Sequence, residues 1–141
     1  MSSSFDLDRF LGAQDSGEAH EQALAELRRG RKTSHWMWFE FPQVAGLGRS
    51  GTARHYAVSG LAEARAYLAH PVLGPRLRQC CEAVLGVEGS SAEEILGSVD
   101  ALKLRSSMTL FARADPDEPL FARVLERYYD GPDDRTEELL G

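Results

Sequence analysis

Apolar residues recur at helical spacing along nearly all of the chain, and one aromatic and glycine-rich stretch, Ser34–Thr52, interrupts them. Residues three and four apart lie on one face of an α-helix, so this spacing predicts helices that each bury one side. We expect Gly30 to end one of these helices and Ser91 to cap a short turn near Ile95. The expected helices span residues 5–13, 18–29, 59–68, 71–86, 98–112 and 117–130, with a last turn at 136–140.

The fold class predicted from this pattern is mainly α, in one compact domain of several helices. A chain of 141 residues is long enough to bury a core without disulfides or metals. We expect residues 6–141 to form the domain and residues 1–5 to form a flexible N-terminus. Cys80 and Cys81 are neighbours that cannot form an ordinary disulfide, so we interpret them as reduced packing residues.

The charge of the chain limits its partners. A net charge of −6 argues against general binding of nucleic acids or anionic membranes, because both require concentrated Lys and Arg. No apolar segment approaches the length of a membrane span, and the N-terminus lacks the pattern of a signal peptide. We therefore expect a cytoplasmic protein without a membrane contact. The sequence predicts no cofactor and does not determine the oligomeric state.

Five large apolar side chains lie in the stretch HWMWFEF. Their period does not distinguish a short extended segment at Trp36–Phe41 from a short helix, because both alternating faces are apolar. Large flat rings with polar groups at both ends, here His35 and Gln43, suit a pocket for a planar ligand. The alternative is plain core, in which the indole N–H groups of Trp36 and Trp38 must each find a partner.

The glycines that follow have the spacing GxGxxG of a dinucleotide-binding loop, at Gly46, Gly48 and Gly51. Pro42 interrupts the passage into this loop, and no second strand follows to complete a parallel βαβ unit, so we do not expect a dinucleotide fold. Glycines expose backbone N–H groups to a ligand. The segment from Gly46 to Ser50 is therefore either a small anion-binding loop or a flexible connection.

Three polar residues, Asp100, Lys103 and Ser107, fall inside the apolar arc of the helix expected from Ser98, since successive residues rotate by about 100°. The apolar stripe itself consists of Leu104, Met108 and Phe111. The opposite side is expected to carry Ala101, Arg105 and Thr109. A pair of Asp100 with Lys103 would reduce the cost of burying charge, so two interpretations remain open: a structural ion pair, or charges gathered in a cleft for catalysis.

No metal site is predicted from the sequence. The four histidines lack the spacing of metal ligands, and no Cys or carboxylate cluster accompanies them. The nucleophile elbow, the Walker loop and the HExxH motif do not occur either. We therefore do not expect a metal enzyme.

Four motifs together resemble the family catalogued as domain of unknown function 1810: HWMWFEFPQ, GLGRS, YLAHPVLGPRL and DALKLRSSMTLF. The likeness runs from Asp6 to Leu140. That family is similar, more distantly, to the YbiA-like or NADAR superfamily, mainly helical proteins connected with NAD and ADP-ribose metabolism that include N-glycosidases. The resemblance implies a YbiA-like fold that binds a ribosyl, ADP-ribose or nucleotide-like small molecule, and it extends to hydrolysis at a C–N glycosidic bond.

Such hydrolysis requires a carboxylate, a proton donor and an aromatic surface. The resemblance implies Asp100, or in second place Glu40, as the carboxylate, with Lys103 and His35 as donors. The residues implied in ligand binding are Trp36, Trp38, Gln43, Gly46, Gly48, Ser50 and Ser107. The competing hypothesis is a noncatalytic protein-interaction module, in which the aromatic and Asp–Lys motifs are structural.

Overall fold

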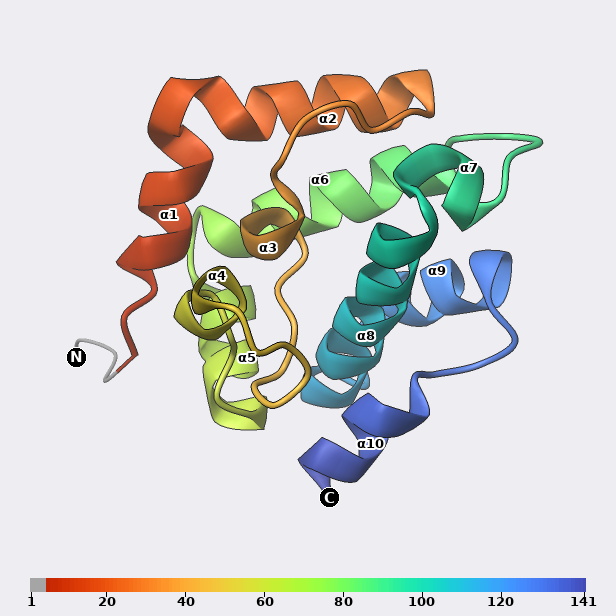
Figure 1. Cartoon of the computed structure of the whole chain (residues 1–141). Helices are drawn as coiled ribbons and strands as arrows, with labels where there is room; N and C mark the ends of the chain where they lie inside the picture. The colour runs from red at the N-terminus through yellow and green to blue at the C-terminus, as the bar shows by residue number, and fades with distance from the viewer. Residues whose placement is uncertain (1–4) are drawn as a thin grey trace.

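The structure, a computed structural model, describes residues 5–141 and confirms the mainly α class. Among these residues the one β contact is an isolated parallel bridge between Val44 and Val58. No helix in this range is long and apolar enough to cross a membrane. In chain order the elements are α1 (Asp8–Asp15), the 3-10 turn η1 (Ser16–Glu18), α2 (Ala19–Arg29), α3 (Met37–Glu40), α4 (Gly51–His55), α5 (Leu61–Ala69), α6 (Leu73–Leu85), α7 (Ala92–Leu96), α8 (Ser98–Ala114), α9 (Leu120–Tyr128) and α10 (Asp134–Leu140) (Figure 1).

The N-terminus predicted to be flexible, residues 1–5, lies outside the described residues except for Phe5. The side chain of Phe5 is partly buried and packs against the core. Phe5, the first residue that the structure describes, therefore already contacts the core.

Helix α8 is the central element, and α5, α7, α9 and α10 pack around it (Figure 1). A helix covered from several directions needs small or apolar side chains on more than one face. The prediction that Ala101 and Thr109 face away from the core is therefore wrong, since each is only 1% exposed. The Thr109 hydroxyl accepts a hydrogen bond from the backbone N–H of Asp133 at 2.8 Å, which holds the start of α10 against α8.

A second layer is formed by α2 and α6, which run side by side, with α1 at one end (Figure 1). Aromatic rings join this layer to α8. The ring of Phe10 lies 5.2 Å from that of Tyr67 between centroids, and Tyr67 lies 5.4 Å from Phe111 on α8. Such tilted and edge-on pairs add to the energy of burial. They link α1, α5 and α8 into one core.

The aromatic stretch forms the short helix α3, so the alternative of an extended segment at Trp36–Phe41 is wrong. Trp36 and Phe41 are fully buried, whereas Trp38 is only partly buried. The reason is the helical turn: in a strand Trp36 and Trp38 would share a face, but two residues apart on a helix they point in different directions. The segment after α3 is tied to the chain before α5, because the backbone N–H of Ala45 donates to Val58 O at 2.7 Å.

The connection from α2 to α3 is organised by the buried carboxylate of Glu26, which is 0% exposed. It accepts hydrogen bonds from the backbone N–H groups of Thr33 at 2.6 Å and Ser34 at 2.9 Å, and from Trp36 Nε1 at 3.0 Å. The Ser34 hydroxyl and, at 2.8 Å, the amide of Gln22 also donate to it. Burial alone would raise the pKa of Glu26, but these hydrogen bonds outweigh it and lower the pKa far below the ordinary value of 4.5.

We expect Glu26→Gln to lower the free energy of unfolding by on the order of 3 kcal/mol at neutral pH, because the amide N–H₂ would face other donors. Since the folded pKa lies below the unfolded one, the stabilisation by the carboxylate is complete above pH 4.5 and is lost as the pH falls toward the folded pKa. The difference in the free energy of unfolding between wild type and variant should therefore become smaller at acidic pH. Denaturant unfolding at several pH values measures it, and Glu21→Gln on the exposed side of α2 is the matched control. A difference in the free energy of unfolding that stays constant across the pH range would contradict the stabilising role of the Glu26 carboxylate anion.

Candidate functional site

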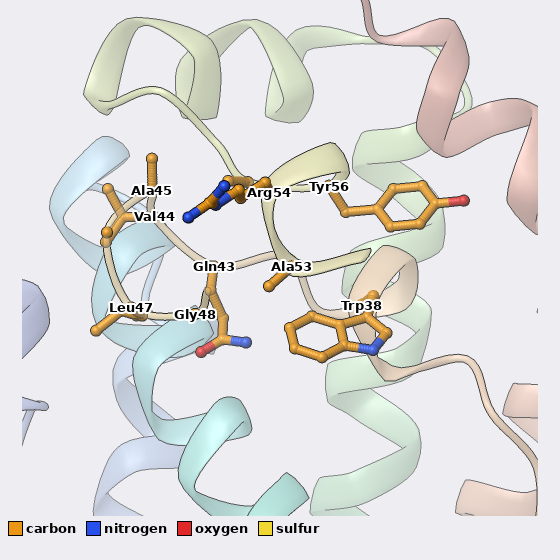
Figure 2. Close-up of a pocket in the computed structure, with 11 residues that line it drawn as sticks. Trp38, Gln43, Val44, Ala45, Leu47, Gly48, Ala53, Arg54 and Tyr56 are labelled. Atoms are coloured by element: carbon orange, nitrogen blue, oxygen red, sulfur yellow. The ribbon is translucent and has the colours of Figure 1, made fainter. Parts of the chain in front are cut away.

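Three hollows in the surface meet at the indole of Trp38. The first has a volume of about 260 Å³ and lies between α3, the segment of residues 46–50, which we call the glycine loop, and α4 (Figure 2). The second, about 190 Å³, lies between the same loop and the first turns of α8. The third, about 560 Å³, lies between α3 and α4. The largest falls within the range of roughly 300–1,000 Å³ that small-molecule sites occupy. We call the three together the Trp38 concavity.

The first hollow has one aromatic wall and one polar wall. Figure 2 shows the indole of Trp38 and the amide of Gln43 on one side, with Arg54 extending from α4 and the ring of Tyr56 pointing away from it. The backbone of residues 44–48 closes the remaining side. A ring system with directed polar groups around it is the arrangement expected for a planar, polar ligand.

The glycine loop reaches this position because two of its residues lack a side chain. At Gly48 a Cβ atom would lie 2.5 Å from the Cβ of Ala53 on α4, closer than any ordinary contact. Gly46 has a φ of +104°, a left-handed conformation that disfavours other residues, and it lies against Leu139 of α10. The glycines therefore serve close packing of the loop against α4 and α10.

Behind the concavity, Asp100 binds two lysines. Lys32 Nζ lies 2.9 Å and Lys103 Nζ 3.1 Å from its two carboxylate oxygens. Burial raises the pKa of Asp100, but the hydrogen bonds from both lysines outweigh it, so the pKa is lowered and the group is an anion. Lys103 also lies over the Trp38 ring, with Nζ 3.8 Å from the centroid, and Lys32 lies 5.2 Å from the centroid of Trp36. Both ammonium groups thus gain cation–π contacts.

The lining of the Trp38 concavity carries positive charge and no negative charge. Among residues 5–141, Arg54 and Lys103 line the hollows together with His35 and His55, and no Asp or Glu does. This contrasts with the net charge of −6 of the whole chain. A surface of this kind attracts anions.

The residues implied by sequence separate into two groups. The concavity is lined by Trp38, Gln43, Gly46, Gly48, His35 and Lys103. The others lie elsewhere. Trp36 is core and donates its indole N–H to Glu26. Ser50 caps α4 by accepting from the Ala53 N–H at 3.0 Å. The buried hydroxyl of Ser107 has no hydrogen-bond partner among residues 5–141. Asp100 does not line the hollows and pairs with Lys103.

Sequence reasoning missed Arg54, His55 and Tyr56, which the short helix α4 brings to the concavity. A signal for this helix was present, since Ser50 is a typical N-cap residue. The expected helices leave residues 30–58 without an element, because the five residues of α4 give no periodic pattern.

Comparisons with known proteins agree with this fold. The family model described as protein of unknown function DUF1810 matches residues 4–140. The chain belongs to this family. It is also similar to a solved structure, the conserved hypothetical protein Rv1873 from Mycobacterium tuberculosis, with 52% identity over 98% of each chain and a TM-score of 0.94. No curated protein matches the chain.

For this DUF1810 protein we expect Gly48→Ala to lower the free energy of unfolding by about 1–3 kcal/mol, because the added methyl group overlaps Ala53. Ala53→Gly removes the overlapping atom and by itself costs about 1 kcal/mol in α4. The double variant should therefore be more stable than the sum of the single effects implies, which a double-mutant cycle of thermal unfolding measures. Strict additivity would show that the loop does not pack on α4 in this way.

Proposed function

We propose that the Trp38 concavity binds a nucleotide-like small molecule, with a planar base on the indole and a phosphate at the cationic side chains. The observation that supports this most is the combination of an aromatic wall with a lining of Arg54, Lys103 and two histidines and no carboxylate. Stacking on an aromatic ring is worth about 1–3 kcal/mol per base, and a phosphate gains charge-assisted hydrogen bonds from Arg and Lys. The distant similarity of the family to proteins of ADP-ribose metabolism supports the same ligand class.

The proposal covers binding and stops before hydrolysis. Cleavage of a glycosidic bond requires a carboxylate that faces the sugar. Asp100 does not line the hollows, and both of its oxygens are bound to lysines. Glu40, the second candidate, is 1% exposed and contacts His20 in the interior. The proposal therefore includes the binding part of the predicted reaction and leaves out the hydrolysis.

The noncatalytic interaction module remains as a second candidate, and one observation favours it. Val99 and Leu102, on the first turns of α8, are 65% and 64% exposed and form the rim of the concavity. Exposed large apolar side chains side by side are typical of a protein-binding surface. In this case the concavity would receive a side chain of a partner protein, and free nucleotides would not bind.

Titration of the protein with AMP, ADP-ribose, adenosine and ribose 5-phosphate tests the proposal. We expect AMP and ADP-ribose to raise the melting temperature and to change the fluorescence of Trp38, because the free energy of binding adds to that of folding. Adenosine lacks the phosphate and ribose 5-phosphate lacks the base, so each should bind at least roughly tenfold more weakly, a difference of about 1.4 kcal/mol. No response to any of the four would contradict nucleotide binding and favour the interaction module.

Variants distinguish the residues proposed to bind the base from those proposed to bind the phosphate. Trp38→Ala should remove binding of both AMP and adenosine. Arg54→Ala and Lys103→Met should weaken AMP about tenfold and leave adenosine unchanged, since a phosphate contact acts through charge. Lys103→Met should keep the fold, because Asp100 retains Lys32. Arg49→Ala, in the same loop but outside the lining, is the control for a general loss of positive charge.

A further inference from the structure

A second group of chemically active side chains lies in the interior, away from the Trp38 concavity. His20 of α2, Glu40 of α3 and Cys80 of α6 are 4%, 1% and 0% exposed. One ligand atom from each lies within 4.8 Å of the others. The expectation that no Cys or carboxylate accompanies a histidine is therefore wrong. The three residues are distant in sequence, and the packing of α2 and α3 on α6 brings them together.

The hydrogen bonds of His20 are compatible with a proton or a metal ion between its ring and Glu40. His20 Nε2 lies 3.1 Å from the amide oxygen of Gln79, which can only accept, so this nitrogen carries a hydrogen. His20 Nδ1 lies 2.8 Å from Glu40 Oε1. In a neutral ring with the hydrogen on Nε2, the lone pair of Nδ1 would face a carboxylate oxygen. With the Gln79 amide in this orientation, a second proton or a metal ion satisfies Nδ1 beside Oε1.

Two further features favour a metal ion over a proton. Glu40 Oε2 is buried without a hydrogen-bond partner among residues 5–141, although a buried carboxylate oxygen ordinarily has one. Cys80 Sγ lies 3.6 Å from Glu40 Oε1, to which its S–H donates a weak hydrogen bond. As a thiolate beside a divalent ion, the same sulfur would be a strong ligand.

The donor set identifies the class of metal. Nitrogen, carboxylate oxygen and sulfur together are typical of zinc, and the thiolate excludes Mg²⁺ and Ca²⁺. Zinc bonds of about 2.0–2.3 Å place the ligand atoms of a tetrahedral site roughly 3.3–3.7 Å apart. The separation of Cys80 Sγ from Glu40 Oε1 already lies in this range, and that of His20 Nδ1 from Glu40 Oε1 needs to widen by about half an ångström. One thiolate, one carboxylate and a neutral imidazole balance the charge of Zn²⁺.

We propose that His20, Glu40 and Cys80 form a buried zinc site that joins α2, α3 and α6. Binding of Zn²⁺ displaces the thiol proton of Cys80 and the proton shared by His20 and Glu40, and both are released to solvent. Gln79 is exposed and accepts from the far side of the His20 ring, so it holds the ring in the tautomer that presents Nδ1 to the ion. The site is structural, because none of its residues lines the Trp38 concavity.

The test uses full-length protein freed of metal with a chelator and titrated with Zn²⁺ or Co²⁺. We expect one Zn²⁺ per chain, a rise in the melting temperature, and a near-ultraviolet thiolate-to-cobalt absorption with Co²⁺. Cys80→Ala should remove the absorption and weaken Zn²⁺ binding at least a hundredfold. The adjacent Cys81 is equally buried but contacts Met108 instead of the cluster, so Cys81→Ala is the matched control and should behave as wild type.

Glu40→Gln serves as a second variant, since it keeps the size of the side chain and its contact with His20 while removing the charge. It should weaken Zn²⁺ binding at least tenfold with helix content unchanged by circular dichroism. Absence of Zn²⁺ binding by folded wild-type protein would overturn the proposal. The same holds if Zn²⁺ binds without the thiolate absorption of Co²⁺, as it would at surface histidines, or if Cys81→Ala and Cys80→Ala lose binding equally. Nucleotide binding is measured separately, so the two proposals fail or succeed independently.

Discussion

The position of the Trp38 side chain at the surface depends on how the four-residue helix α3 is held in place, because so short a helix is not stable in isolation. Side chains from α2 and α3 hold it at both ends. Glu26 binds the backbone of Thr33 and Ser34 and the indole of Trp36 before the helix begins. Glu40, its last residue, binds His20. With Trp36 drawn into the core by Glu26, the helical turn directs Trp38 to the surface.

In this arrangement the carboxylates of Glu26, Asp100 and Glu40 have different structural roles. Glu26 accepts five hydrogen bonds and is satisfied as a buried anion. Asp100 holds Lys32 and Lys103 beside the two indoles, so that Lys103 reaches the concavity while the negative charge stays behind it. Of these three carboxylates, Glu40 is the one with a buried oxygen that has no hydrogen-bond partner within residues 5–141. The physical difference is the number of hydrogen-bond donors near each carboxylate. Glu26 and Asp100 have donors for both oxygens and are structural, whereas one oxygen of Glu40 is free to bind a metal ion.

The proposed nucleotide site and the proposed zinc site share α3 but use opposite sides of it. Trp38 and Phe39 face the surface hollows, whereas Met37 and Glu40 face α6 and the interior. A metal ion at Glu40 would fix the end of α3 and limit movement of Trp38. The loop after α3 is fixed separately, by the backbone contacts of residues 43–45 with Val58 and by the approach of Gly48 to Ala53. The concavity is therefore formed largely before any ligand arrives.

Much of the secondary structure could be predicted, because the signals for it are local. Gly30 ends α2 in a left-handed conformation, and Ser91 forms a capping box with Glu94 at α7, as expected. Apolar spacing marked α6, α8 and α9 for the same reason. The candidate site was found in part, through Trp38, Gln43, the glycines and Lys103, since these lie in two unusual stretches. The short helix α4 with Arg54 was missed, because five residues give no periodic pattern.

The sequence by itself determined that the chain is helical, where most of its helices begin and end, and that it belongs to the DUF1810 family. Only the tertiary structure decided that Trp36 is core and Trp38 is surface, that α8 is covered on the side of Thr109, and that His20, Glu40 and Cys80 meet. The physical reason is the sequence separation over which each kind of interaction acts. Helix signals act over three or four residues, whereas these contacts join residues 10 to 60 positions apart, whose approach is set by the packing of whole helices.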